Sequence, residues 1–262
     1  DLPKELYELD ILDGSPPCST FSMAGSREKA WGKEKQFREG QAMQTLDDLV
    51  LVYCETIIKL KPKVFLLENV KGIIQGNAKW YSKQIVQRME SAGYTVQVFM
   101  LNAASMGVPQ KRERVFFIGH KKEFDLPRLL LRFQEKAVTF GEVRDKSETK
   151  QDLTVVQKGL WDRQKPSDKT LADVREKANG FTDNLIGDKD VCPTITSGGK
   201  FLCKDKPRWF NKQEFCQCGT YPLDYNFIDL EAQYLIGMSV PPVAMAQISL
   251  EIYKQWLSKC VP

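Results

Sequence analysis

Histidine and paired cysteine are scarce in this 262-residue chain, and their scarcity excludes several kinds of site. His120 is the single histidine. The seven cysteines are odd in number and scattered, and only Cys216 and Cys218 lie close together in the sequence. A Cys/His zinc site needs ligands at short spacings, and a secreted disulfide scaffold needs an even set. The sequence therefore argues against a metal site and a disulfide framework, and it favours a reducing cytoplasm.

Long hydrophobic runs and a strong net charge are also lacking. No apolar run approaches the ~20 residues of a membrane span, and the first residues have neither the basic start nor the apolar core of a signal peptide. We therefore expect no membrane partner. The formal net charge is only +4. Lysines and arginines nevertheless cluster at 27–38, 111–122 and 200–212. One such run is usually a solvated surface, whereas three favour a polyanionic partner.

The first half of the chain alternates short apolar runs with segments of helical periodicity. Short buried strands are expected at residues 10–12, 64–67, 95–101 and 115–118. Helices are expected at 45–60, before Pro62, and at 80–92, before Gly93. This alternation favours parallel pairing in an open α/β sheet. Ligands of such sheets bind beyond the carboxyl ends of the strands.

Polar residues follow two of these expected strands. Cys18 follows the first strand in a Gly-Ser-Pro-Pro turn, and Glu68 and Asn69 follow the second. Two prolines stiffen the turn, which suits the aiming of a nucleophile, although a buried apolar cysteine is the alternative. The polar loop between Cys18 and residue 45 has the length of a functional lid. We expect Cys18 and Glu68 to meet at one edge of the sheet.

Four motifs, taken in their order and spacing, make the chain resemble a known family. They are Pro16-Pro17-Cys18, Glu68-Asn69-Val70-Lys71-Gly72, Gln110-Lys111-Arg112-Glu113-Arg114 and Gly237-Met238-Ser239-Val240-Pro241-Pro242. The chain resembles the C5-cytosine-specific DNA methyltransferases of bacteria and phages over nearly its whole length. Residues 193–199 resemble the stretch that contacts the DNA backbone in that family, and 208–222 resemble the segment that supports its recognition domain.

The resemblance implies an α/β fold with a Rossmann-like S-adenosylmethionine-dependent methyltransferase sheet. This sheet would be N-terminally incomplete and accompanied by a smaller, irregular target-recognition domain. From about residue 126 the periodicity weakens, and an amphipathic helix closes the chain. The expected domains are 1–124 (catalytic, without its first motifs), 125–230 (target recognition) and 231–262 (a C-terminal helix that returns to the catalytic domain).

The resemblance also assigns roles in catalysis. A thiolate of Cys18 would add to C6 of cytosine and make C5 nucleophilic. Glu68 would share a proton with N3, which burial favours by raising the pKa of a carboxyl group. Arg114 would stabilise charge on O2, with Arg112 as a second contributor. Simpler alternatives are a turn-capping carboxylate for Glu68 and surface ion pairs with Glu113 for the two arginines.

Cofactor and DNA contacts follow from the same resemblance. The implied S-adenosyl-L-methionine contacts are Pro17, Leu49, Ser239 and Val240. The implied DNA contacts are Ser22, Thr194, Thr196, Ser197 and Arg208, and no metal is implied. The partner would be double-stranded DNA, bound by a monomer in a bacterial cytoplasm. The target cytosine would be flipped out of the duplex, while basic clusters hold phosphates and the second domain reads base edges.

The chain departs from the family pattern at several places. The glycine-rich cofactor loop and the acidic ribose residue are not found, Ser19 stands where the family usually has Gln, and Met238 stands where it usually has Asn. The expectation is a missing N-terminal segment or subunit. One alternative is therefore a non-catalytic or split-enzyme DNA-binding half that needs an N-terminal partner. Others are a tRNA cytosine C5 methyltransferase and, far behind, a cysteine hydrolase, since His120 has no acidic orienter nearby.

The incomplete cofactor motifs predict weak cofactor binding. We expect the 262 residues alone to bind S-adenosylmethionine poorly and to turn over little. Calorimetric titration of the chain with the cofactor measures this directly. A dissociation constant in the micromolar range would contradict the expectation.

Overall fold

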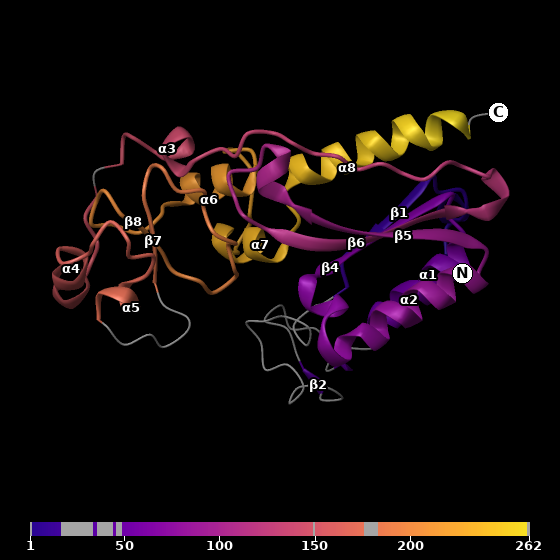
Figure 1. Cartoon of the computed structure of the whole chain (residues 1–262), viewed down its shortest axis with the longest axis horizontal. Coiled ribbons are helices and arrows are strands. Elements are labelled where there is room, and N and C mark those ends of the chain that lie inside the picture. Colours follow the sequence, from indigo (N-terminus) through magenta and orange to yellow (C-terminus); the bar gives the residue numbers. More distant parts are fainter. Residues whose placement is uncertain are drawn as a thin grey trace. The chain divides into compact units, whose positions relative to one another are not determined.

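The chain forms two compact units, each built from separate segments (Figure 1). The computed structural model describes residues 2–16, 34–35, 44–45, 49–148, 150–175 and 183–260. Unit 1 comprises 1–101, 113–131 and 250–262, and unit 2 comprises 102–112 and 132–249. The chain therefore passes between the units four times. The expected domains, with boundaries at residues 124 and 230, are defined by their functions. The two compact units do not test that assignment.

Unit 1 is a sheet with two helices on one face. Among the described residues its elements are β1 (Ile11–Gly14), a small antiparallel pair β2 (Glu34–Lys35) and β3 (Gln44–Thr45), α1 (Leu49–Leu60), β4 (Val64–Val70), α2 (Lys79–Ser91), β5 (Tyr94–Asn102, its last residue in unit 2) and β6 (Glu113–Lys121). Every strand and helix expected in the first half is present, with shifted ends. The described part of α1 begins at Leu49, and Thr45 lies in β3 instead.

The sheet is mixed, which corrects the expectation of parallel pairing. The strand order is β1-β4-β6-β5 among the described strands. β1 runs parallel to β4, with Ile11 opposite Val64. β6 runs antiparallel to β4, with Val64 opposite His120 and Val70 opposite Arg114. The connection from β5 to β6 is too short for the helical crossover that a parallel pair requires, so β6 enters the sheet in the opposite direction.

A second correction concerns the end of β4. The expected strand ended at Leu67, but β4 continues to Val70, so Glu68 and Asn69 lie within it rather than beyond it. Glu68 is buried and Asn69 is completely so. The end at Leu67 is expected because a charged residue after an apolar run usually marks the place where a strand becomes exposed to solvent. Here the neighbouring β6 keeps pairing with it, Glu68 opposite Phe116 and Asn69 opposite Val115.

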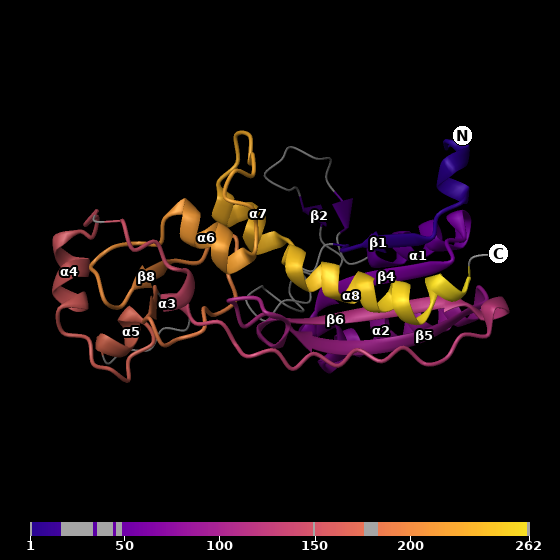
Figure 2. The same cartoon turned by 90° about the horizontal axis from the view of Figure 1, so that it is seen from above.

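The hydrophobic core of unit 1 lies between the sheet and the helices α1 and α2. Phe65, Leu67, Val115 and Phe117 alternate along β4 and β6 and pack against both helices. The other face carries His120, whose ring meets Trp256 edge to face with centroids 4.7 Å apart. Trp256 directly follows α8 (Pro242–Gln255), and its indole nitrogen donates to Pro127 O. Figure 2 shows the last turns of α8 running over the strands, as the amphipathic pattern of the C-terminal helix predicts.

Unit 2 consists of short elements around its own core. They are α3 (Phe140–Val143), α4 (Val155–Trp161), α5 (Leu171–Val174), the parallel pair β7 (Asn184–Ile186) and β8 (Phe201–Cys203), α6 (Lys212–Gly219) and α7 (Ala232–Met238). Capping boxes begin α4, α5 and α6 at Thr154, Thr170 and Asn211. Phe140 and Phe210 stack with ring centroids 4.4 Å apart. The weak periodicity of this region thus reflects short elements rather than a lack of packing.

The C-terminal stretch Ala232–Lys259 is long and apolar enough to span a membrane, judged by length and composition only. It is divided into α7 and α8 at Ser239–Pro241 in the structure. Ile248, Ile252 and Trp256 are fully buried within the protein. Only 28% of the most apolar window of this stretch is buried, so packing inside the protein accounts for a minor part of its apolar character.

The last residue of β1, Gly14, is packed against Tyr53 of α1. The Tyr53 hydroxyl donates to Leu12 O and Leu66 O, both at 3.0 Å, and therefore ties α1 to β1 and β4. Burial raises the pKa of this hydroxyl, which keeps it protonated as a donor. A Cβ on Gly14 would collide with the Tyr53 ring. Glycine at position 14 is thus required by close packing rather than by an unusual φ.

Gly14→Ala should lower the free energy of unfolding by about 1–3 kcal/mol, because a rigid, doubly hydrogen-bonded ring has to move. Gly159→Ala is the matched control, since it lies within α4 with nothing within 4 Å of an added Cβ. That variant should gain roughly 0.5–1 kcal/mol from helix propensity. Urea unfolding measures both, and equal effects in the two variants would contradict the packing argument.

Candidate active site

Glu68 and Arg114 form an ion pair where β4 ends and β6 begins. Arg114 Nε lies 2.9 Å from Glu68 Oε1, and the two side chains are 15% and 10% exposed. Arg114 is opposite Val70 in the register, so it is the diagonal neighbour of Glu68 on the same face of the sheet. Glu113 pairs instead with Lys71, at 3.0 Å. The simpler alternative of an Arg114–Glu113 surface pair is therefore wrong.

Asn69 connects this ion pair with the turn that leads to Cys18. Its amide nitrogen donates to Pro16 O at 3.2 Å, and its amide oxygen accepts from Val70 N at 2.9 Å. Both ends of the amide are used, which fixes its orientation. The backbone just before Cys18 is thereby attached to β4 next to Glu68. Pro17, Cys18 and Ser22 themselves lie outside the described residues.

Other thiols of the chain are unsuited to nucleophilic attack. Burial raises the pKa of Cys54 to about 11 and that of Cys203 to about 12. Cys192 is completely buried, and its pKa is also raised by burial. A thiol acts as a nucleophile through its thiolate, which these surroundings disfavour. None of these three competes with Cys18 for that role.

Arg112 lies in unit 2 and holds two carbonyl groups. Its terminal nitrogens donate to Ile195 O and Gly237 O, both at 3.0 Å, and it is 2% exposed. Gln110 acts in the same way, donating to Cys218 O at 3.2 Å and accepting from Ile195 N at 3.1 Å. These contacts describe a clamp on three backbone segments. A direct catalytic part for Arg112 stays a prediction.

The segment 193–199 is fastened by this clamp. Thr194 donates its hydroxyl to Lys111 O at 2.6 Å, and Gln233 Nε2 donates to Thr196 O at 3.1 Å and to Gly199 O. Thr196 is exposed and Ser197 is half-buried. A Cβ on Gly237 would collide with the backbone of Thr196 and Ser197. The hydroxyl of Thr194 is thus used within the protein, while DNA contacts of Thr196 and Ser197 stay predictions.

The described cofactor candidates are divided between the units. Leu49 is half-buried at the start of α1 in unit 1. Ser239 and Val240 follow α7 in unit 2, both half-buried, and the Ser239 hydroxyl donates to Ile236 O at 3.2 Å. Apolar side chains and backbone groups at helix ends suit the apolar and polar parts of S-adenosylmethionine. Among the described residues, no group of three or more His, Cys, Asp or Glu could hold a metal.

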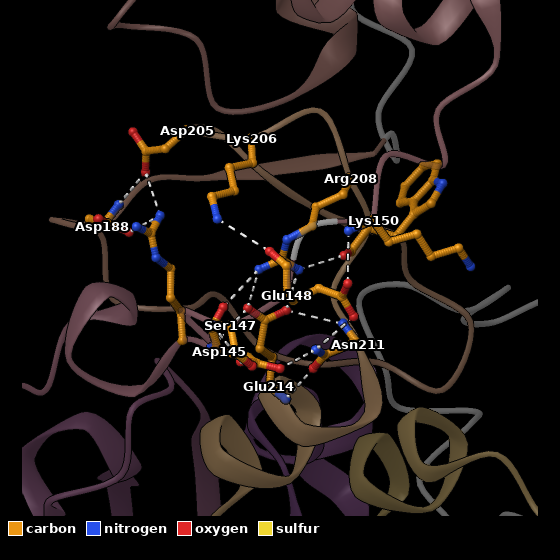
Figure 3. A network of polar contacts seen from close by, with 12 residues as sticks. Asp145, Ser147, Glu148, Lys150, Asp188, Asp205, Lys206, Arg208, Asn211 and Glu214 are labelled. Atoms are coloured by element: carbon orange, nitrogen blue, oxygen red, sulfur yellow. Dashed lines mark hydrogen bonds and ion pairs between the residues drawn. The ribbon is translucent and has the colours of Figure 1, made fainter.

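Arg208 does not have the surroundings of a DNA contact, which corrects that expectation. It is 1% exposed and forms two parallel bonds with Glu214, at 2.7 and 2.8 Å (Figure 3). Glu214 is completely buried at the first turn of α6. The bonds to Glu214 raise the pKa of Arg208, so its charge is retained in the interior. A guanidinium in this position cannot reach a phosphate group.

Further groups complete the network around this buried ion pair. Glu214 also accepts from Asp145 N and Asn211 N, and Arg208 donates to Trp209 O (Figure 3). Hydrogen bonds of this kind offset part of the cost of burying an ion pair, although Arg208 Nε is buried without a hydrogen-bond partner. The sequence does not distinguish Arg208 from the other basic residues of its cluster. The one signal for a structural role is Glu214, which lies six positions later in the capping box of α6.

Sequence reasoning missed two residues that support the site. Tyr53 lies within the helix expected at 45–60, and Gln110 is the first residue of a motif, but the sequence assigns neither residue a role. The signal for Gln110 was its place in a strand-like entry, where it forms a bridge with Cys192. The signal for Tyr53 was weak, because nothing local shows that its hydroxyl reaches two strands.

A family model of C-5 cytosine-specific DNA methylases matches residues 1–254. The chain belongs to this family. The methyltransferase M.Bsp6I of Bacillus sp. (strain RFL6) is 28% identical over 274 residues, covering 97% of this chain and 82% of that protein. M.XorII of Xanthomonas oryzae pv. oryzae is 35% identical over 126 residues, covering 46% of this chain and 26% of that protein. The chain spans only about a quarter to a third of the first relatives.

Solved structures confirm the fold. DNMT2 of Spodoptera frugiperda gives a TM-score of 0.63 at 15% identity, covering 93% of this chain and 79% of that chain. The Entamoeba histolytica methyltransferase EhMeth gives 0.60 at 13% identity, covering 94% and 77%. The expected methyltransferase α/β architecture is therefore confirmed, with the mixed sheet described above. At this identity the likeness concerns the fold alone.

Arg208→Ala should reduce the free energy of unfolding by about 3–5 kcal/mol, since Glu214 would stay buried without its partner. The exposed Arg163 of the same unit is the matched control. Arg163→Ala should change the free energy of unfolding by less than about 0.5 kcal/mol. Thermal unfolding compares the two. If Arg208→Ala kept the wild-type stability but lost affinity for DNA, Arg208 would be a phosphate contact after all, and its structural role would be wrong.

Proposed function

We propose that this protein transfers a methyl group from S-adenosylmethionine to C5 of a cytosine in duplex DNA. The observation that supports this most is the Glu68–Arg114 ion pair, attached through Asn69 to the turn that leads to Cys18. A carboxyl group, a guanidinium and a thiol are the groups that activation of a pyrimidine ring requires, and the structure holds the first two together. Membership of the cytosine-5 methylase family agrees with this chemistry.

The chemistry begins with the thiolate of Cys18. Its sulfur forms a bond to C6, and the electrons of the C5–C6 double bond move into the ring. Glu68 holds the proton at N3, and Arg114 keeps Glu68 oriented and stabilises negative charge that develops on the ring oxygen. S-adenosylmethionine, when bound, would supply an electrophilic methyl group to C5 and would leave as the neutral thioether S-adenosylhomocysteine. Transfer of the C5 proton to a water molecule re-forms the C5–C6 double bond and expels the Cys18 thiolate from C6. The proton at N3 returns to Glu68, which restores the aromatic ring.

The protein reaches the cytosine only if that base leaves the duplex. Flipping costs about a few kcal/mol, which contacts with the DNA backbone can offset. Thr196 and Ser197 are our candidates for such contacts. We further propose that the cofactor site is completed by a glycine-rich segment outside these 262 residues, on the same or a partner chain.

Exchange of the C5 hydrogen tests the covalent step without the cofactor. Reversible addition of Cys18 to C6 lets C5 exchange its hydrogen with water, so duplex DNA labelled with tritium at cytosine C5 should release tritium. Cys18→Ser should abolish release, and Glu68→Gln should reduce it by about 10²–10⁴-fold.

Cys260→Ser is the control, because Cys260 lies beyond α8 at the C-terminal end. It should release tritium at the wild-type rate. Release that persists in Cys18→Ser would overturn the covalent mechanism. Tritium release from labelled tRNA but not from duplex DNA would overturn the proposed DNA substrate in favour of RNA.

A further inference from the structure

A cleft in unit 2 has the composition of a nucleotide site and is separate in sequence from Cys18, Glu68 and Arg114. Its volume is about 430 Å³, within the usual range of ligand sites. Its lining includes Asp152, the start of α4, Gly199 and Lys200. Four further lining residues are aromatic and make up its aromatic wall: Phe201, Trp209, Phe210 and Phe215.

The charged groups of the cleft are of both signs. Lys200 is exposed, and its Nζ lies 5.8 Å from the centre of the Trp209 ring. Asp152 Oδ1 accepts from Trp209 N at 3.0 Å, and its Oδ2 lies 3.7 Å from Nζ of Lys150, a side chain that is 71% exposed. The cleft therefore has one lysine and one carboxylate in its lining, and a second lysine, Lys150, lies outside the lining beside the carboxylate. This arrangement suits a ligand with a phosphate group at one end and hydrogen-bond donors at the other.

The cleft is also continuous with the predicted DNA-contacting segment. Gly199, the last residue of 193–199, and Gln233, which donates to Thr196 O and Gly199 O, both line it. A DNA strand that follows this segment would therefore arrive at the mouth of the cleft. That placement favours a nucleotide of the DNA itself over a free metabolite.

We propose that this cleft holds one unstacked nucleotide of the DNA, other than the target cytosine. The inference rests on the proposed function, since it deepens how the protein binds DNA. The base lies against the aromatic wall, where stacking is tolerant of base identity. Asp152 accepts from an exocyclic amino group, as carboxylates do from N4 of cytosine. The ammonium group of Lys200 leaves the Trp209 ring and pairs with the adjoining phosphate.

Fluorescence anisotropy with labelled 12-nucleotide oligo(dC) and oligo(dT) tests the two contacts separately. Wild-type protein should bind oligo(dC) about tenfold more tightly, the effect of one hydrogen bond to a charged acceptor. Asp152→Asn should abolish this preference, while the amide oxygen can still accept from Trp209 N. Lys200→Ala should weaken both probes equally and lower the slope of log K against log salt by about 0.7.

Lys189→Ala is the matched control, because Lys189 is an exposed lysine of the same unit that does not line the cleft. It should keep both the preference and the slope. Wild-type behaviour of Asp152→Asn and Lys200→Ala would overturn the inference, with folding checked by thermal unfolding. If the wild-type protein bound neither oligonucleotide nor duplex DNA, the proposed DNA substrate would fail as well. Duplex binding with no effect of either variant would overturn the cleft alone.

Discussion

The antiparallel register of β4 and β6 is the constraint on which the candidate active site depends. In an antiparallel pair the beginning of one strand lies beside the end of the other. Arg114, the second residue of β6, is therefore opposite Val70, the last residue of β4, and diagonal to Glu68. A parallel β6 would place this arginine at the opposite edge of the sheet. The 2.9 Å ion pair follows from strand direction before any side-chain preference acts.

The buried pair also explains why the carboxylate can sit inside a strand. Glu68 would be costly in a sheet without a partner. Arg114 supplies one from the neighbouring strand, and Asn69 uses its own amide to hold Pro16 O. The polar groups of Glu68 and Asn69 thus have partners on β6 and on the backbone at Pro16 and Val70. The hydroxyl of Tyr53 in α1 contacts two strands, β1 and β4, at Leu12 O and Leu66 O.

Much of the fold and part of the site could be predicted from the sequence, for identifiable reasons. Apolar periodicity located the strands and helices of unit 1 because they are long enough to show a period. Strand direction could not be read this way, since a strand has the same period in either direction. Motif order linked Glu68 with Arg114, but not the internal use of Arg208, because burial depends on contacts with distant residues such as Asp145. The helices and strands of unit 2 could not be predicted from periodicity, because they are too short to repeat a pattern.

The way in which the chain crosses between units limits how the two can be exchanged among relatives. Residues 102–112 belong to unit 2, although they precede β6 and are remote in sequence from the rest of that unit. A graft of 132–249 alone would bring the carbonyls of Ile195, Gly237 and Cys218 without the Gln110 and Arg112 that bind them. An exchange of unit 2 between family members therefore has to move two segments together, the short piece before β6 and the large one.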